Sequence, residues 1–202
     1  MASRHGVRDW VSSRPPRSLF QSSEVPGSLG SVNTALSRMA ADPSGPITRV
    51  RNGLYWVKPA SSRFGFGRPD SVAAALSIAG PGAGPSGWSA SQMLGLTTQV
   101  PAVVTIATLG RPPKGFKDIH FVTRANLDRR DLNPVEVATL EVLRDFPLHT
   151  DVGTSLDDVR RHFIDFVNSG DADPDCLIRV ARKEHHAGAR ANLDEIFATA
   201  SM

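Results

Sequence analysis

The sequence is poor in cysteine and has no long apolar run. Cys176 is the only cysteine among 202 residues, so an internal disulfide is impossible, and a structural zinc site would lack cysteine ligands. The longest apolar stretches, residues 72–79 and 102–109, are far shorter than the roughly 18–20 residues that cross a bilayer. No basic-then-apolar signal segment opens the chain. We therefore expect a soluble cytoplasmic protein with neither a membrane partner nor a metal site.

The sequence also lacks the motifs of common enzyme classes. No P-loop lysine and no His-Arg-Asp or Asp-Phe-Gly triplet is present, which excludes a conventional kinase. Residues 82–87 match Gly-x-Gly-x-x-Gly, but no strand is predicted before them and Pro85 removes an amide that a phosphate would bind, so a plain loop is favoured. Glu184, His185 and His186 have no further metal ligand at a suitable spacing and are assigned to a solvated polar patch. We identify no catalytic residue and no cofactor site.

The charge that is present is distributed unevenly along the chain. Residues 1–68 contain ten Lys or Arg against three acidic residues, a formal charge of +7. Residues 69–202 contain 13 basic against 17 acidic residues, a formal charge of −4. Hydrophobic residues make up 40% of the chain, which suffices for a core, and the length allows one ordinary domain or two small ones. A small basic module joined to a larger acidic one indicates a polyanion-binding end and an end with another role.

Residues 1–68 predict three short helices followed by a hairpin. A first helix, with Ser3 as its cap, ends at Pro15-Pro16, and a second short segment covers residues 19–25. A third helix starts at Ser28 or Ser31 and ends near residue 41. Asn52-Gly53 between two β-rich runs is the signal of a two-residue type I′ hairpin. Three compact helices and a basic hairpin predict a winged helix-turn-helix.

The third helix divides into an apolar stripe and a polar face without acidic residues. Val32, Leu36 and Met39 lie on the stripe, which predicts that this side is buried. Asn can bond adenine and Arg can bond guanine in a bidentate way, so the polar face is a candidate for contacts with base edges or nearby phosphates. The candidate DNA-binding residues are Asn33, Thr34, Ser37 and Arg38 on this helix, Arg49, Arg51 and Lys58 in the wing, and Arg4, Arg8 and Arg17 beside it. An ordinary solvated surface is the alternative for each of them.

Two further features of this half have two interpretations each. Alternation along the second hairpin strand turns one of Tyr55 and Trp56 inward, and the other could stack on a sugar or a base. Arg63 and Arg68 stand in a stretch rich in Gly and Phe. They either extend the basic surface or belong to a linker, and we favour the linker.

Residues 69–202 predict a mixed domain with a small sheet and four or more helices. Strands are expected at residues 102–108 and 118–124, which are rich in apolar and β-branched residues. Asn133-Pro134 with Glu136, and Ser155 with Asp158, are the capping-box starts of two helices. Further helices are expected at residues 71–79, 90–94, 173–183 and 192–200. The predicted fold class is therefore α/β, of the α+β kind, with a winged helix-turn-helix at residues 1–68 and a mixed domain at residues 69–202.

Three segments resemble a known family. They are Ala35-Leu36-Ser37-Arg38-Met39, Val50-Arg51-Asn52-Gly53-Leu54-Tyr55 and Leu94-Gly95-Leu96-Thr97-Thr98-Gln99-Val100-Pro101. Together they resemble the AbiEi family of bacterial type IV antitoxins over roughly residues 3–145. The resemblance implies an autorepressor that binds inverted repeats in the double-stranded promoter DNA of its operon. It also implies a C-terminal domain that is needed to neutralise a cognate nucleotidyltransferase-like toxin. Members of the family are thought to oppose their toxins without a stable complex, so the resemblance leaves the mechanism of neutralisation open, and it implies nothing for residues after about 150.

Two other functions stay open at this stage. An antitoxin that does not hold its toxin could modify it covalently, so an atypical serine protein kinase that phosphorylates the toxin is the first alternative. A DNA-binding adaptor without any toxin is the second. The sequence leaves the operator, the oligomeric state and the toxin-facing surface open.

Overall fold

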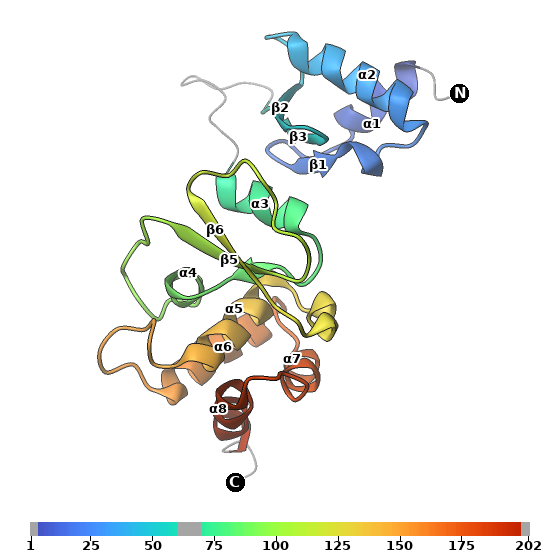
Figure 1. The fold of residues 1–202 in the computed structure, drawn as a ribbon. Helices are drawn as coiled ribbons and strands as arrows, with labels where there is room; N and C mark the ends of the chain where they lie inside the picture. Colours follow the sequence, from blue (N-terminus) through green and yellow to red (C-terminus); the bar gives the residue numbers. More distant parts are fainter. Residues whose placement is uncertain (1–3, 60–69, 199–202) are drawn as a thin grey trace. The chain divides into compact units, whose positions relative to one another are not determined.

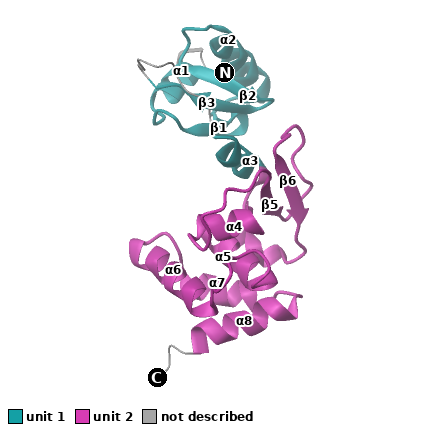
Figure 2. Ribbon diagram, turned by 90° about the vertical axis from the view of Figure 1, so that its left-hand side faces the viewer, with its two compact units in different colours: residues 1–78 teal, residues 79–202 magenta. Residues whose placement is uncertain are grey.

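The structure is a computed structural model that describes residues 4–59 and 70–198 (Figure 1). The chain divides into two compact units, residues 1–78 and 79–202 (Figure 2). Each unit combines helices with a three-stranded sheet, so the expected α+β class is confirmed. The expected domain boundary after residue 68 lies outside the described residues, as do Ser3, Arg63 and Arg68.

Unit 1, residues 1–78, combines the helices α1 and α2 with a small antiparallel sheet, and a further helix, α3, follows the sheet in sequence. Its elements are α1 (Arg4–Ser12), β1 (Leu19–Gln21), the 3₁₀ turn η1 (Ser22–Glu24), α2 (Leu29–Ala41), β2 (Ile47–Arg51), β3 (Leu54–Val57) and α3 (Ser71–Ala79). β3 is the central strand and pairs with β1 on one side and β2 on the other. Helix, strand, 3₁₀ turn, helix and hairpin occur in the order that is typical of a winged helix-turn-helix, and α3 follows the hairpin.

The core of unit 1 forms because apolar residues recur at helical spacing on α1 and α2. Val7 and Val11 of α1 and Val32 and Leu36 of α2 are all buried. Met39, the other residue of the predicted stripe, is half-buried and packs against this core, so the stripe of α2 faces inward as predicted. Phe20 of β1 fills the space beneath them, with its ring stacked on that of Tyr55 at a centroid distance of 5.7 Å. Burial of each such side chain contributes about 1.5–3 kcal/mol to folding.

Residues 19–25 differ from the expected short helix. Leu19–Gln21 is a strand, and only Ser22–Glu24 makes a helical turn. The cause is pairing with β3: the Val57 amide donates to the Ser18 carbonyl, and the Ser22 amide donates to the Gly53 carbonyl. A distant strand thus satisfies backbone groups that a local helix would otherwise have paired.

The hairpin turns at Asn52-Gly53 as expected, but the turn is not of type I′. That type needs positive φ at both central residues, and only Gly53 has it, at 76°. The register shifts between Arg49 and Arg51, which marks a β-bulge that takes up the difference. In the second strand both Tyr55 and Trp56 are buried, the Trp56 indole donating to the Arg17 carbonyl. Neither ring is therefore available to stack on a base.

Unit 2, residues 79–202, surrounds one central helix. Its elements are β4 (Gly84–Pro85), α4 (Trp88–Met93), β5 (Val104–Thr108), β6 (Ile119–Thr123), the 3₁₀ turn η2 (Leu127–Asp131), α5 (Pro134–Asp145), α6 (Leu156–Ser169), α7 (Pro174–Ala181) and α8 (Ala187–Ala198). The expected strands are confirmed as β5 and β6, which pair in parallel, while β4 pairs with β5 in the antiparallel direction. The helix expected at residues 192–200 starts five residues earlier, at Ala187.

Helix α5 is the central element of unit 2, packed against α4, β4, α6, α7 and α8. Figure 2 shows it among the helices α4, α6, α7 and α8. Every position from Glu136 to Leu143 is buried. The predicted capping box is confirmed, because the Asn133 side chain accepts bonds from the amides of Val135 and Glu136, and the Glu136 carboxylate accepts one from the Asn133 amide. The other predicted box, Ser155 with Asp158 at the start of α6, is also present.

The glycine-rich segment 82–87 serves backbone packing. A Cβ atom on Gly84 would lie 2.5 Å from the Val137 Cβ, and one on Gly82 would lie 2.5 Å from the Arg129 carbonyl oxygen. Only glycine lets this segment approach α5 and η2 so closely. The motif therefore has a structural reason of its own.

Candidate nucleic-acid interface

The outer face of α2 is polar and exposed. Asn33, Thr34, Ser37 and Arg38 are all exposed, and none of the 13 residues of α2 is acidic. The Thr34 hydroxyl donates to the Gly30 carbonyl at 2.9 Å, one turn earlier in the helix. Core burial of Val32 and Leu36 orients the helix, so the same packing that stabilises unit 1 presents this face to solvent.

Arg8 and Arg38 line one hollow of about 580 Å³ beside the C-terminal part of α2. Asp42, directly after the helix, lines it as well. Hydrogen bonds from the Ser44 hydroxyl and amide hold the pKa of Asp42 below its usual value, so this carboxylate is ionised at neutral pH. Two guanidinium groups and one carboxylate thus line this hollow.

The wing residues lie at opposite ends of the hairpin. Arg49 is exposed near the turn, and its Nη2 donates to the Asn52 Oδ1 at 2.6 Å. Arg51 is half-buried at the bulge. Lys58 lies at the open end, opposite Pro46, where its Nζ donates to the Pro43 carbonyl at 2.9 Å. At about 3.3 Å per residue, Lys58 is about 17 Å along the strand from Gly53 in the wing turn.

Arg17 is exposed and has positive φ, 67°, which is uncommon for a residue other than glycine. Its backbone explains the conformation: the amide donates to the Val57 carbonyl, and the carbonyl accepts from the Trp56 indole. Arg4 is the first residue of α1. The structure thus places Asn33, Thr34, Ser37 and Arg38 together on α2, with Arg8 beside Arg38 and with Arg49 and Lys58 separated along the hairpin.

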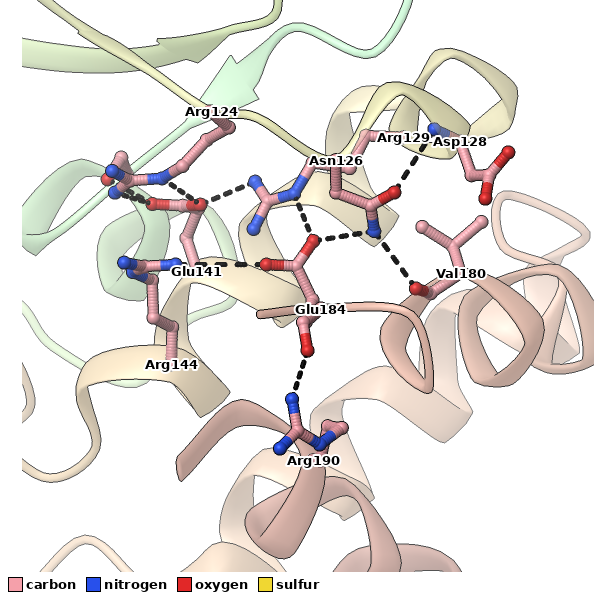
Figure 3. Close-up of polar contacts among 10 residues, drawn as sticks. Arg124, Asn126, Asp128, Arg129, Glu141, Arg144, Val180, Glu184 and Arg190 are labelled. Carbon is pink, nitrogen blue, oxygen red and sulfur yellow. Dashed lines mark hydrogen bonds and ion pairs between the residues drawn. The ribbon is translucent and has the colours of Figure 1, made fainter. Parts of the chain in front are cut away.

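A second polar site, in unit 2, was not expected from the sequence (Figure 3). Arg129 has no exposed side-chain surface, and it forms ion pairs with Glu141 at 2.6 Å and with Glu184 at 2.7 Å. Arg124 makes two further hydrogen bonds with Glu141, at 2.9 and 2.6 Å. We call Arg124, Arg129, Arg144, Glu141 and Glu184 the arginine cluster.

The two carboxylates of the arginine cluster are ionised. Burial alone would raise the pKa of Glu141, but the hydrogen bonds from Arg124, the charges of Arg129 and Arg124, and the Ser86 hydroxyl lower it to about 2 from 4.5. Burial likewise opposes ionisation of Glu184, and the bonds from Arg129 and Asn126 lower its pKa. The arginine cluster is therefore a set of charges that stabilise each other in the interior.

Comparison with known proteins adds little to this geometry. No family model matches the chain, and no curated protein matches it. Among solved structures, the chain is similar to the RV2827C protein from Mycobacterium tuberculosis, with 17% identity and a TM-score of 0.40 over 99% of this chain and 77% of that one. A likeness this weak carries no argument about fold or function.

The described ranges, 4–59 and 70–198, contain no group of three or more His, Cys, Asp or Glu placed to hold a metal ion. They also contain no helix that is both long and apolar enough to span a membrane.

The sequence did carry one signal of the arginine cluster. Glu141 stands four residues after Val137 and one before Val142, inside a helix whose neighbouring positions are apolar and buried. A carboxylate at such a position must find a cation or several hydrogen-bond donors, because an unpaired buried charge is too costly. The signal predicts that a partner exists, but not that it is Arg124 and Arg129.

Proposed function

We propose that this protein binds double-stranded DNA through unit 1, with α2 in the major groove and the β2–β3 wing on the adjacent backbone. The observation that carries the proposal is the acid-free exposed face of α2, with Arg38 on it and Arg49 on the neighbouring wing. Asn33 and Arg38 are the residues best suited to read base edges, whereas Arg49 suits phosphate contact. The formal charge of +7 on residues 1–68 would favour association with a polyanion.

The test is fluorescence anisotropy of the full-length protein on its own upstream DNA and on a scrambled duplex, at two salt concentrations. A specific repressor binds the native duplex more tightly, and this preference persists at the higher salt. Equal binding to both duplexes, lost together as salt rises, would reject sequence-specific recognition. In that case unit 1 would be a phosphate-binding surface only.

Two variants separate the roles of helix and wing. Arg38→Gln is expected to weaken binding to the native duplex by about tenfold or more and to change base preference, because a bidentate base contact contributes about 1–3 kcal/mol. Arg49→Gln is expected to weaken binding to all duplexes alike and to make the salt dependence shallower by about one phosphate contact. Arg161→Gln, an exposed arginine of α6 paired with Asp158, is the matched control. A wing variant that binds every duplex as tightly as the wild type would refute the placement of the wing.

We further propose that the DNA is the promoter of the protein's own operon and that unit 2 opposes a co-encoded nucleotidyltransferase-like toxin. This part rests on the AbiEi-like segments alone. Incubation of both proteins with ATP, followed by intact mass spectrometry of the toxin, tests it against the kinase alternative. An unchanged toxin mass together with loss of toxicity on co-expression supports antagonism without modification, whereas a gain of one phosphoryl group identifies a modifying enzyme.

A further inference from the structure

A second hollow, of about 300 Å³, opens beside the arginine cluster in unit 2. The end of β6 and the following turn line it on one side, the last turn of α5 lines another, and the turn between α7 and α8 closes it. Its volume is at the lower end of the roughly 300–1,000 Å³ that small-ligand sites occupy. We call it the basic hollow. The polar residues that line it include Arg124, Asn126, Arg144, Glu184, His185 and His186.

The basic hollow has cationic groups with unused hydrogen-bonding capacity. Arg144 is only loosely paired, with its Nη1 3.7 Å from Glu184 and its Nε 4.0 Å from Asp145, and a quarter of its side chain is exposed. Among the described residues no acceptor is hydrogen-bonded to its guanidinium group. Arg124, by contrast, is held by two bonds to Glu141. Of the two arginines that line the basic hollow, Arg144 can therefore bind a ligand with the smaller loss of existing hydrogen bonds.

Two buried nitrogen atoms, one in the arginine cluster and one on a residue that lines the basic hollow, have no hydrogen-bond partner within the described parts of the chain. One is Nη2 of Arg129, on a side chain with no exposed surface, and the other is Nδ1 of His186. In Figure 3 the Arg129 nitrogen that no dashed line reaches is turned toward the side where Arg144 lies. Buried polar atoms are nearly always hydrogen-bonded, so the unpaired Arg129 donor calls for an acceptor from outside the described residues.

The charge balance favours an anion as that acceptor. The ionised side chains of this region carry one positive charge in excess, because four arginines meet three carboxylates: Arg124, Arg129, Arg144 and Arg190 with Glu141, Glu184 and Asp145. Arg190 contacts the backbone carbonyl of Glu184 rather than a carboxylate. Helix α8 begins at Ala187, directly after the two histidines, and has no acidic residue in its first turn, so the positive end of its dipole adjoins the hollow.

We propose that the basic hollow binds a phosphate group, with Arg144 and His186 as its principal contacts. A guanidinium fork and a helix N-terminus are both suited to phosphate oxygens. The site is distinct from the DNA-binding surface of unit 1, and the proposal does not depend on that function. The phosphate can come from the free ion or from a mononucleotide, and the two share the recognised chemistry.

The experiment measures the thermal unfolding of the full-length protein as inorganic phosphate replaces chloride at constant ionic strength. A ligand that binds only the folded state raises Tm with concentration, which yields its Kd. Phosphate is expected to stabilise the wild type, and Arg144→Gln is expected to weaken binding by about tenfold or more, as for loss of a charged hydrogen bond. His186→Gln breaks no ion pair and is expected to weaken binding severalfold, so it decides the question if Arg144→Gln folds poorly.

The controls separate the basic hollow from other surfaces and one phosphate source from the other. Arg161→Gln is expected to bind phosphate as the wild type does, and so is Arg38→Gln. Loss of phosphate binding in Arg38→Gln alone would place the phosphate on unit 1 and overturn the proposal. The proposal would also be overturned if phosphate raised the Tm of the wild type, Arg144→Gln and His186→Gln equally, or if it did not raise the Tm of the wild type. AMP and adenosine form further arms: tighter binding of AMP than of phosphate, with adenosine silent, supports the proposal and identifies a nucleotide.

Discussion

Replacement of Glu141 by glutamine tests the arginine cluster most directly. The side chain of Glu141 has no exposed surface and accepts hydrogen bonds from Arg124, Arg129 and Ser86 at distances between 2.6 and 2.9 Å. Glu141→Gln keeps the shape and removes the charge, which leaves two guanidinium groups facing a neutral amide. Breaking a buried ion pair on one side costs about 3–5 kcal/mol. That is a large part of the roughly 5–15 kcal/mol by which a domain is stable.

The pKa of Glu141 gives a second estimate of the same quantity. Its value in the folded protein is about 2, against 4.5 for an unperturbed glutamate. At about 1.36 kcal/mol per pH unit, a difference of this size corresponds to about 3 kcal/mol. Since the folded-state pKa is the lower one, this stabilisation is complete above pH 4.5 and is lost as the pH falls toward 2. The free-energy difference between wild type and Glu141→Gln should therefore be largest at neutral pH and shrink on acidification.

Urea denaturation followed by far-UV circular dichroism, from pH 7 down to pH 3, measures this difference without adding salt. Asp165→Asn, an exposed carboxylate of α6 changed in the same way, is the control and should leave the free energy of unfolding nearly unchanged. If Glu141→Gln lowered the free energy of unfolding by less than about 1 kcal/mol at pH 7, the reasoning would be refuted, since a broken buried ion pair should cost more. A decrease in the free energy of unfolding that stays constant with pH would show that the shape of the side chain, rather than its charge, causes the destabilisation.

Two other changes test the packing around α5, each by urea denaturation. Gly84→Ala should destabilise unit 2 by about 1–3 kcal/mol, because the new Cβ would lie 2.5 Å from that of Val137; Gly110→Ala, which meets nothing within 4 Å, should be close to neutral. Asn133→Ala should cost about 0.5–2 kcal/mol through loss of the cap of α5, and Asn133→Asp should retain most of it. A neutral Asn133→Ala would mean that packing alone sets the start of the helix.

Features that depend on neighbouring residues could be predicted from the sequence. α2 ends at Ala41 because Asp42-Pro43 cannot continue a helix, and α5 starts at Pro134 because Asn133 and Glu136 cap each other. The polar face of α2 could be predicted for the same reason: it is the complement of an apolar stripe. That it binds DNA stays a prediction.

Features that depend on distant residues could not be predicted. Leu19–Gln21 is a strand because it pairs with β3. That partner lies more than 30 residues further along the chain, so the residues near Leu19 do not reveal it. The parallel pairing of β5 and β6 is equally invisible, since each strand alone is compatible with either direction. The partners of Arg129 are 12 and 55 residues away, and no local spacing encodes such a meeting.

The long sequence separations within the arginine cluster have a consequence for folding during synthesis. The core of unit 1 is complete once Val57 has been made, so unit 1 can fold early, as N-terminal domains generally do. The cluster has to wait, because Ser86 and Glu141 are separated by 55 positions, and so are Arg129 and Glu184. Until Glu184 leaves the ribosome, Arg129 has only one of its two carboxylates. A nascent chain halted before that residue would carry a folded unit 1 ahead of a second unit whose interior charges are still unbalanced.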